Sequence, residues 1–366
     1  MSLTVVGSVA LDTVSSPFGR VERELGGSAT YAALTAAFFT PVSIVAPVGE
    51  DFGSEERGAL EHRNLNRGGL EVRQGPTFTW TAHYDFDMSV AHTDAIELNV
   101  FQGWRPRLSD GARESDSLFL GALDPEIQID VRAQWRGAKW SALDSNEYWI
   151  RSKPDALREA ISQVDIVLMN DLEARRLTER PMLLQAARRI ISWGPRAVVL
   201  RFGEYGCTVL TEGDYFSLPG YPLEQAADPT GCGDAFAGGF LGYLDLVRGS
   251  ALTEEVLRRA TFYGAVMSSY CYEEFGARRL GLLSEHEVSY RLGELQRMTH
   301  FEHVPTEPMP RGGEDGHAAL ERPPLTPSTQ PLAAPAPASG TPEYRSPGRT
   351  PSTEPLPRPG RPNGRG

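Results

Sequence analysis

The sequence predicts an α/β fold built on a doubly wound, mostly parallel sheet. Short apolar runs rich in β-branched residues alternate with helical stretches in both halves of the chain, and glycine turns introduce two of the helices. Parallel strands need crossover connections, so helices are expected on both faces of the sheet. Ligands bind to such sheets beyond the carboxyl ends of the strands.

The first strand is predicted over residues 3–9, a compact β-branched run. Asp12 follows this run, which places its side chain at the edge where ligands bind. A glycine turn occupies residues 26–28, and Ser28 is expected to cap the alanine-rich helix predicted over residues 29–39. Strand, glycine turn and helix together are typical of the opening of an α/β domain.

A second buried strand is predicted over residues 42–48 and a crossover helix over residues 55–62. Between residues 77 and 101 the pattern changes to two segments of alternating polarity without a helix between them. This pattern predicts antiparallel strands that stand apart from the main sheet. The alternative is a hairpin at the edge of that sheet.

The second half of the chain returns to strands that alternate with helices. Short core strands are predicted over residues 117–120, 140–143, 165–169 and 197–202, and helices over residues 155–163, 182–192, 233–247, 254–270 and 285–297. Polar residues follow several of these strands, at the edge where ligands bind.

Composition divides the 366-residue chain near residue 304. Of the 28 prolines, 16 lie between Pro305 and Pro362, in a segment with a single aromatic residue, Tyr344. Such a segment buries too little apolar surface to offset the entropy of ordering it. We therefore predict one folded domain over residues 1–303 and a disordered, Pro-rich tail over residues 304–366.

The formal net charge is −12, and the predicted tail is nearly neutral, with six acidic residues against seven arginines. The acidity therefore belongs to the predicted domain. Nucleic acids are bound mainly by neutralising phosphates with lysine and arginine. The charge balance thus excludes nucleic acid as an expected partner.

Cysteine usage predicts a reducing compartment. Cys207, Cys232 and Cys271 make an odd number without CxxC spacing, which disfavours a disulfide framework and a zinc site. No segment approaches the roughly 18 consecutive apolar residues of a membrane-spanning helix, and no basic leader precedes the first apolar run. We expect a cytoplasmic protein without a membrane partner.

The segment DPTGCGDAFAGG, residues 228–239, carries the strongest chemical signal. Gly231 and Gly233 allow backbone conformations that bring successive N–H groups to one point, and the apolar spacing that follows predicts a helix whose positive end faces that point. Such a turn attracts phosphate, whereas the carboxylate of Asp234 beside it repels phosphate. The carboxylate is instead suited to take a proton from a hydroxyl that attacks the phosphate, as a phosphotransferase base does.

This segment resembles the signature of the ribokinase-like carbohydrate kinases, also called the phosphofructokinase-B type. The resemblance implies a ribokinase-like fold with a small β lid formed by strands within about residues 13–25 and 77–101. It also implies an anion hole at Gly231, Cys232 and Gly233 for the transferred phosphoryl group. Asp234 corresponds to the catalytic base of that family. Relatives commonly have alanine in place of Cys232, a mild departure because backbone N–H groups build the hole.

The same resemblance assigns substrate binding to Asp12 and to the turn of Gly26, Gly27 and Ser28. Asp12 is expected to accept hydrogen bonds from substrate hydroxyls. Family members often carry an asparagine a few residues after the glycines, and this chain has none there. The identity of the substrate therefore stays open.

The resemblance further implies ATP and Mg2+ as cofactors. Asn170 and Glu173 follow a predicted strand and, three residues apart, share one face at the start of a helix. In the family this pair organises magnesium, often through water, and magnesium prefers few protein ligands. Gly203 and Gly206 bracket a turn that borders the nucleotide in relatives.

Three more residues complete the predicted site. Arg201 stands where many relatives carry lysine, and Thr230 adds a hydroxyl to the phosphate turn, so both are expected to contact the nucleotide. Asp228 matches an aspartate that in many relatives helps to hold a monovalent cation. Whether potassium binds is left open.

Together these residues predict a magnesium-dependent transfer of the ATP γ-phosphoryl group to a hydroxymethyl group of a sugar or sugar derivative. One alternative is a nucleoside kinase of the same fold, in which the lid residues Trp80, Tyr84 or Phe86 stack on the base. Another is a catalytically silent regulator that binds nucleotide or sugar and recruits a partner through the tail. A homodimer is compatible with each of these hypotheses.

Overall fold

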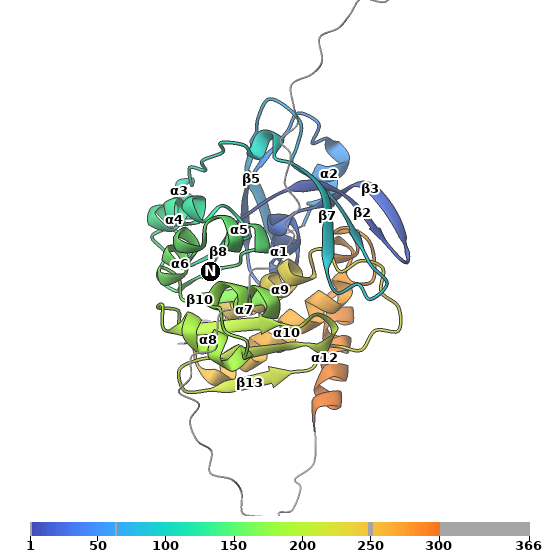
Figure 1. Cartoon of the computed structure of the whole chain (residues 1–366). Helices are drawn as coiled ribbons and strands as arrows, with labels where there is room; N and C mark the ends of the chain where they lie inside the picture. The colour runs from blue at the N-terminus through green and yellow to red at the C-terminus, as the bar shows by residue number, and fades with distance from the viewer. Residues whose placement is uncertain (1, 63, 248–251, 301–366) are drawn as a thin grey trace, which may run out of the picture. The chain divides into compact units, whose positions relative to one another are not determined.

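A nine-stranded sheet forms the centre of the computed structural model, which describes residues 2–62, 64–247 and 252–300 (Figure 1). Its strands are β1 (Leu3–Val6), β4 (Val42–Val48), β5 (Leu65–Val72), β8 (Ser117–Leu120), β9 (Trp140–Leu143), β10 (Ile166–Asn170), β11 (Ala197–Arg201), β12 (Cys207–Leu210) and β13 (Tyr215–Leu218). The tail predicted over residues 304–366 lies outside the described residues.

The strand order is β13-β12-β11-β10-β9-β8-β1-β4-β5. All neighbours from β11 to β5 pair in parallel, whereas β12 and β13 pair antiparallel at one edge. The described helices are α1 (Ser28–Ala36), α2 (Ser54–Ala59), α3 (Asp110–Arg113), α4 (Pro125–Gln134), α5 (Glu147–Ser152), α6 (Pro154–Ser162), α7 (Asp171–Thr178), α8 (Leu183–Ile191), α9 (Cys232–Leu246), α10 (Glu254–Cys271), α11 (Arg278–Gly281) and α12 (Glu285–Thr299). The mostly parallel sheet confirms the predicted fold class.

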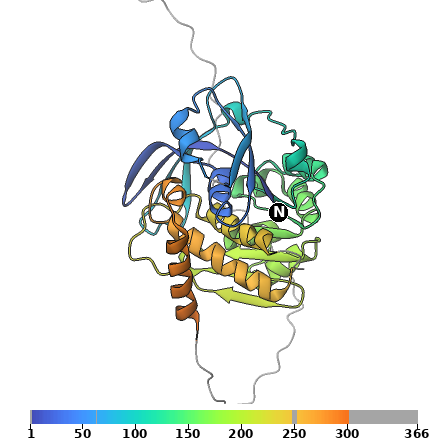
Figure 2. The same cartoon turned by 180° about the vertical axis from the view of Figure 1, so that it is seen from behind.

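Successive side chains of the strands point to opposite faces of the sheet and belong to two separate hydrophobic cores, one on each face. Ile166 and Leu168 of β10 belong to the core that includes residues of α1, α9 and α10. Val167 and Met169 belong to the core beneath α4, α6, α7 and α8. Figures 1 and 2 show these two helical layers from opposite sides. Because side chains alternate across a strand, strands that are buried on both faces need the continuous apolar runs seen in the sequence.

A second sheet of four strands stands apart from the first, in the order β3-β2-β6-β7. It comprises β2 (Ala10–Ser16), β3 (Gly19–Gly26), β6 (Thr79–Tyr84) and β7 (Ala91–Glu97). The separate small sheet is therefore confirmed, and the alternative of an edge hairpin on the main sheet is wrong. The edge strand β5 was not predicted, because its mixed polarity, which suits its partly exposed position, gives no continuous apolar run.

Three predictions for the start of the chain are wrong. The strand predicted over residues 3–9 ends at Val6, and Asp12 lies inside β2 of the small sheet rather than after the first strand. The N-cap of α1 is Gly27, not Ser28, and Ser28 is the first helical residue. Gly27 has φ of 95°, and a β-carbon there would lie 2.5 Å from the Ser8 carbonyl oxygen, so the chain can approach Ser8 only with glycine. The Ser28 hydroxyl then accepts the Ser8 N–H at 3.1 Å instead of capping the helix.

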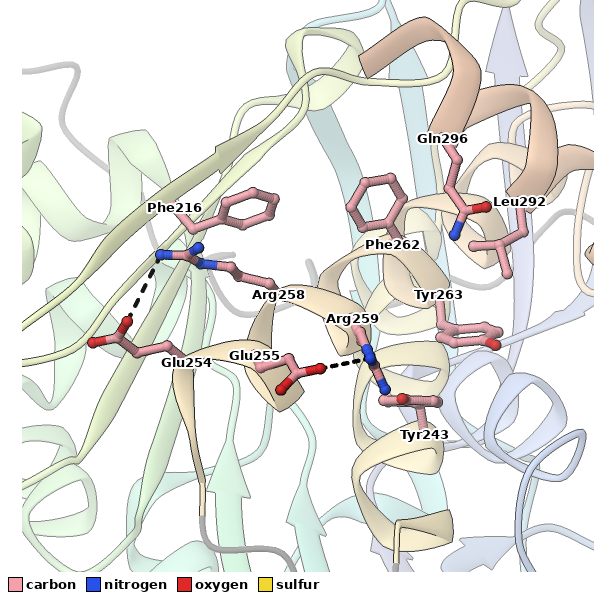
Figure 3. A pocket seen from close by; sticks show the side chains of 10 residues that line it. All are labelled: Phe216, Tyr243, Glu254, Glu255, Arg258, Arg259, Phe262, Tyr263, Leu292 and Gln296. Carbon is pink, nitrogen blue, oxygen red and sulfur yellow. Dashed lines mark hydrogen bonds and ion pairs between the residues drawn. The ribbon is translucent and has the colours of Figure 1, made fainter. Parts of the chain in front are cut away.

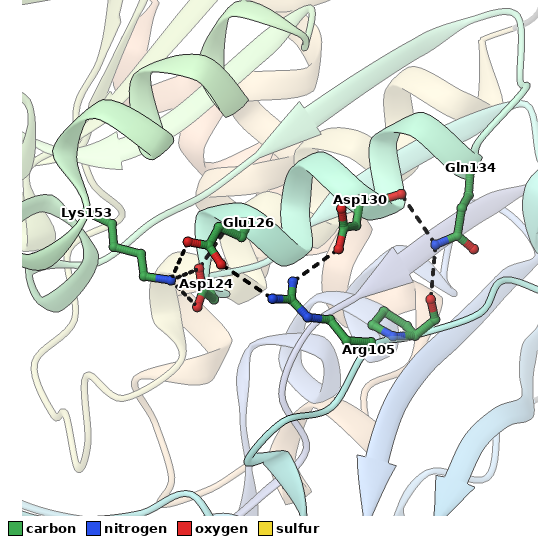
Figure 4. A network of polar contacts seen from close by, with 7 residues as sticks. Arg105, Asp124, Glu126, Asp130, Gln134 and Lys153 are labelled. Atoms are coloured by element: carbon green, nitrogen blue, oxygen red, sulfur yellow. Dashed lines mark hydrogen bonds and ion pairs between the residues drawn. The ribbon is translucent and has the colours of Figure 1, made fainter.

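Charged side chains hold the beginning of α4 against neighbouring segments (Figure 4). Asp124 caps the helix by accepting the Glu126 N–H at 3.0 Å, and the Lys153 ammonium lies 2.8 Å from the Asp124 carboxylate. Arg105, in the loop before α3, lies with its guanidinium 3.1 Å from the Asp130 carboxylate. Several of these groups are exposed, so the network orients the helix more than it stabilises the fold.

A buried carboxylate anchors the far end of α9. Asp245 is fully buried, and its side chain accepts hydrogen bonds from Thr40 at 2.5 Å and Ser117 at 2.7 Å. The Lys139 ammonium lies 3.2 Å from the same carboxylate. These three partners come from segments that are distant in sequence, so one side chain joins α9 to the main sheet.

We expect Asp245→Ala to lower the free energy of unfolding by about 3 to 5 kcal/mol, because it leaves two buried hydroxyl groups without their acceptor and removes the negative charge that faces Lys139. Urea unfolding followed by circular dichroism measures the loss. Glu255→Gln is the control, since Glu255 pairs with Arg259 on the exposed surface of α10 and its removal should leave the urea midpoint in place. Equal midpoints for the two variants would contradict the anchoring role.

Candidate active site

The turn before α9 presents free N–H groups at the positive end of a helix. Gly231 is the N-cap, in the left-handed conformation with φ of 75°, and α9 begins at Cys232. Within the described part of the chain, the N–H groups of Gly231, Gly233 and Asp234 have no hydrogen-bond acceptor. Donors in this position suit an anion. The N–H of Cys232 instead donates to the Pro229 carbonyl at 3.2 Å, so Cys232 is the least available donor of the predicted anion hole.

Both glycines of the turn are required by close neighbours. A β-carbon on Gly231 would overlap the ring of Tyr31, a buried residue of α1. A β-carbon on Gly233 would lie 2.5 Å from Nη1 of Arg201. The turn is therefore packed against a ring on one side and a guanidinium on the other, which fixes the direction of its N–H groups.

Asp234 lies in the first turn of α9 and is partly buried. Burial, and next the negative charge of Asp144, raise its pKa to about 7, whereas the positive charge of Arg201 acts in the opposite direction. A carboxyl group with a pKa near neutral is a stronger base than an ordinary aspartate and is still largely ionised slightly above pH 7. The base predicted from the sequence is thus placed beside the free N–H groups.

Asp144 is a further charged residue of the site, one that was not predicted from the sequence. It follows β9 and is buried, with its carboxylate 2.8 Å from Nη2 of Arg201 and accepting the Ser145 N–H at 2.8 Å. A polar residue directly after a buried strand was the available signal, because parallel strands deliver such residues to the ligand-binding edge. Arg201 itself is at the end of β11, two strands away in the sheet.

Asn170 and Glu173 form a capping box at the start of α7. The Glu173 N–H donates to Asn170 Oδ1 at 2.8 Å, and the Asn170 N–H donates to Glu173 Oε2 at 2.8 Å. Burial, then repulsion from Asp144, raise the pKa of Glu173 to about 8, and Asp234 adds to the repulsion. This geometry accounts for both residues as helix caps, and their predicted role toward magnesium remains a prediction.

The charge distribution here fits a divalent cation. The carboxyl groups of Asp144, Glu173 and Asp234 repel one another, and a single guanidinium, that of Arg201, offsets them. A divalent ion near Glu173 would relieve that repulsion. In the described residues no three acidic, histidine or cysteine side chains converge to enclose an ion by themselves. Such an ion would take its remaining ligands from phosphate and water, as magnesium commonly does.

Asp12 has the properties expected of a group that accepts substrate hydroxyls. Its Oδ1 atom is buried without a hydrogen-bond partner in the described part of the chain. The backbone N–H groups of Trp80 and Gly27 act to lower the pKa of the same carboxyl group. Burial, followed by the charges of Asp228 and Asp234, raises the pKa of Asp12 to about 8. The predicted substrate aspartate and the predicted base are therefore close enough to influence each other.

The small sheet contacts the signature segment directly. The hydroxyl of Tyr84 on β6 lies 3.1 Å from the hydroxyl of Thr230, and the Ser16 hydroxyl of β2 donates to the Ala227 carbonyl at 2.7 Å. These contacts span 146 and 211 residues of sequence. They place the small sheet over the turn, where a lid was predicted.

Three other predicted residues have structural partners that explain them without a ligand. Asp228 is buried and accepts the Thr230 N–H at 2.8 Å, and burial raises its pKa. Gly206 has φ of 102°, and a β-carbon there would overlap the Leu218 carbonyl. Gly203 has φ of 58° in a short 3-10 turn. The cation and nucleotide contacts expected of these residues stay predictions.

A groove of about 680 Å3 lies elsewhere, between β13, α9, α10 and α12 (Figure 3). Stacked rings of Tyr243 and Tyr263, 4.5 Å apart, form part of its wall. The ion pair of Arg258 and Glu254 forms another part. The groove shares no residue with the predicted site.

Known proteins match this chain over its predicted domain. A family model described as the pfkB family carbohydrate kinase matches residues 3–278. The cytidine kinase of Thermococcus kodakarensis is 35% identical over 254 residues, which cover 66% of this chain and 88% of that relative. The nucleoside kinase of Methanothermobacter thermautotrophicus is 25% identical over 260 residues, which cover 65% and 81% of the two chains.

Solved structures show the same fold. The nucleoside kinase of Methanocaldococcus jannaschii matches with a TM-score of 0.64 at 20% identity, covering 80% of this chain and 98% of the other. The ribokinase of Thermotoga maritima matches with a TM-score of 0.64 at 19% identity, covering 80% and 99%. The predicted ribokinase-like fold is confirmed. None of the described helices combines the length and apolarity needed to cross a bilayer.

Proposed function

Because this chain belongs to the pfkB family of carbohydrate kinases, as the match over residues 3–278 establishes, we propose that it transfers the γ-phosphoryl group of ATP to the hydroxymethyl group of a nucleoside. The observation that carries the proposal is the position of Asp234. It lies at the positive end of α9, beside unpaired N–H groups, with a pKa raised by burial to about 7.

The residues of the site have complementary tasks in this reaction. Asp12, through its unpaired buried Oδ1 atom, accepts a hydrogen bond from a sugar hydroxyl and so orients the acceptor. Asp234 takes the proton of the attacking hydroxyl as the new O–P bond forms and the bond to ADP breaks. The N–H groups of Gly231 and Gly233 donate to the phosphoryl oxygens, where negative charge accumulates.

Asn170 and Glu173 are the residues that would hold Mg2+, largely through water. When bound, the ion would neutralise phosphate charge. Arg201, Gly203, Gly206 and Thr230 are the proposed nucleotide contacts, and Asp228 is the proposed ligand of a potassium ion. Oligomeric state and cytoplasmic location stay predictions.

Two observations favour a nucleoside over a free sugar as the acceptor. The 35% identical relative is a cytidine kinase. In addition, Trp80 shares a face of β6 with Tyr84, because the two are four residues apart in a strand, and Tyr84 contacts the signature segment. An indole on that face is placed to stack on a base. A sugar or sugar derivative is the second candidate, since the family includes carbohydrate kinases.

The test is ADP formation measured by a coupled assay against a panel of nucleosides and free sugars, with ATP and Mg2+. We expect turnover with at least one nucleoside and higher kcat/KM for it than for D-ribose. Turnover with sugars alone would establish the second candidate. Absence of ADP formation across the panel would contradict the proposal and favour the silent regulator.

Trp80→Ala should raise KM for the nucleoside about 5- to 150-fold, because a stacked base contributes about 1 to 3 kcal/mol. The indole nitrogen Nε1 donates to the Thr93 hydroxyl on the neighbouring strand β7, at 3.1 Å. This bond does not involve the reacting groups, so removal of the indole should leave them in place. Phe86→Ala is the control, since that ring is 92% exposed. Steady-state kinetics on both variants decide the point: an unchanged nucleoside KM in Trp80→Ala would exclude stacking by this residue.

A further inference from the structure

Arg201 and Asp144 form a buried ion pair directly beneath the turn that begins α9. Nη2 of Arg201 lies 2.8 Å from one oxygen of Asp144 and 3.1 Å from the other. The side chains are 14% and 4% exposed, respectively, so the pair is shielded from solvent. A pair with this geometry interacts far more strongly than one on the surface.

The other nitrogen of the guanidinium, Nη1, is turned toward the catalytic turn. It is buried and has no hydrogen-bond partner in the described residues. A β-carbon on Gly233 would lie 2.5 Å from it, so the guanidinium packs directly against the backbone between the anion-hole glycines and Asp234. Nη1 therefore lies against the backbone of the turn whose N–H groups are proposed to bind the phosphoryl group.

Asp144 fixes the guanidinium in this position. The Ser145 N–H donates to Asp144 Oδ1 at 2.8 Å, and the Gln128 side chain donates to the Asp144 carbonyl at 2.8 Å. The carboxylate therefore has one backbone donor and one guanidinium as partners, on a segment held by α4. A lysine in place of Arg201 could keep the charge and contact both oxygens of Asp144, as Lys153 does with Asp124, but it would lack the second nitrogen, Nη1, that lies against Gly233.

We propose that Arg201, held by Asp144, is a positioning residue for the phosphoryl-transfer reaction: its guanidinium supports the Gly233 backbone and places a positive charge beside Asp234, and the paired Asp144 places a negative charge there. This inference rests on the proposed function. The charged and titratable groups that face Asp234 are Asp12 on β2, Asp144 after β9, Glu173 on α7, Arg201 on β11 and the neighbouring thiol of Cys232. Arg201 is the only cation among these groups.

Arg201 and Asp144 shift the pKa of Asp234 in opposite directions, so the two single variants should give opposite results. Removing the positive charge of Arg201 should raise the pKa of Asp234, so that the base is protonated over a wider range of pH. Removing the negative charge of Asp144 should lower the pKa of Asp234. A single charge within about 4 to 6 Å typically shifts a carboxyl pKa by about 1 to 3 units.

The experiment is a 13C NMR titration of aspartate carboxyl groups in the full chain without ATP or acceptor, with the Asp234 signal assigned by its loss in Asp234→Asn. We expect a midpoint near pH 7 in the unmodified protein, a higher one in Arg201→Gln and a lower one in Asp144→Asn. Arg201→Lys should restore most of the wild-type midpoint. Arg258→Gln, which breaks a more exposed ion pair with Asp214 away from the site, should leave the midpoint unchanged.

Because Arg201→Gln leaves a buried carboxylate unpaired, the double variant Arg201→Gln and Asp144→Asn is included as a neutral pair of similar shape. Its Asp234 midpoint should lie between those of the single variants. Shifts in the same direction for both single variants, or no shift in the double variant relative to Arg201→Gln, would overturn the proposal. The titration involves no turnover, so it remains decisive if no acceptor is found and the proposed function fails.

The pH profile of kcat/KM supplies the second measurement. Activity should fall as pH drops through the pKa of Asp234, since the base must be ionised. The acidic limb should therefore move to higher pH in Arg201→Gln and to lower pH in Asp144→Asn. Unmoved limbs with uniformly reduced rates would mean that the pair has only a structural role.

Discussion

Asp234→Asn should lower kcat by about 10² to 10⁴-fold, the contribution that a general base typically makes. The substitution keeps the shape of the side chain but removes its ability to accept the proton of the attacking hydroxyl. Because the N–H groups of the turn remain, ATP should bind as in the unmodified protein. Single-turnover kinetics with a nucleoside and calorimetry with a nonhydrolysable ATP analogue measure the two quantities separately.

Asp155→Asn is the matched control for this prediction. The Asp155 side chain is 96% exposed on α6, so the same chemical change there should leave kcat unaltered. If Asp234→Asn kept a wild-type kcat with normal ATP binding, the assignment of the base would be wrong. A parallel loss of ATP binding would instead indicate that the variant had disturbed the anion hole.

Gly231→Ala is expected to lower kcat about 10² to 10³-fold, which is the typical cost of losing one donor of an oxyanion hole. Two effects combine here. The left-handed conformation costs a residue with a β-carbon about 1 to 2 kcal/mol, and the new methyl group would overlap the buried ring of Tyr31. Either the turn or the ring must move, and the N–H groups then lose their alignment.

Gly103→Ala separates backbone strain from the effect on the site. Gly103 has φ of 67°, similar to the 75° of Gly231, but a β-carbon on Gly103 would meet no atom within 4 Å. Both variants should therefore lose some stability in urea unfolding, whereas only Gly231→Ala should lose kcat. A folded Gly231→Ala protein with undiminished turnover would show that the turn is not an anion hole.

Local sequence patterns were sufficient for most of the secondary structure. The strands at residues 42–48, 117–120 and 140–143 were predicted with the bounds that the structure has. These strands are buried on both faces, so their continuous apolar runs are distinctive. β5 lies at the edge of the sheet and is partly exposed, so it has no continuous apolar run.

Residues 8–28 show where local patterns fail. Asp12 was expected after a strand but lies within β2, whose pairing with β3 and β6 depends on a segment almost 70 residues away in sequence. Serine is a favoured residue type at an N-cap, yet Gly27 is the N-cap of α1 and the Ser28 hydroxyl accepts the Ser8 N–H. In both cases a contact distant in sequence outweighed a local preference.

Contiguous residues were enough to predict the α/β class, the glycine turn before α9 and the candidate base, because helix polarity and the freedom of glycine are local properties. The environment that sets the pKa of that base forms only when distant strands come together. Asp144 and Arg201 are 57 residues apart, and their pairing beneath Gly233 follows from the order of β9, β10 and β11 in the sheet. Burial and neighbouring charge set the pKa of Asp234, and neither exists until the strands have assembled.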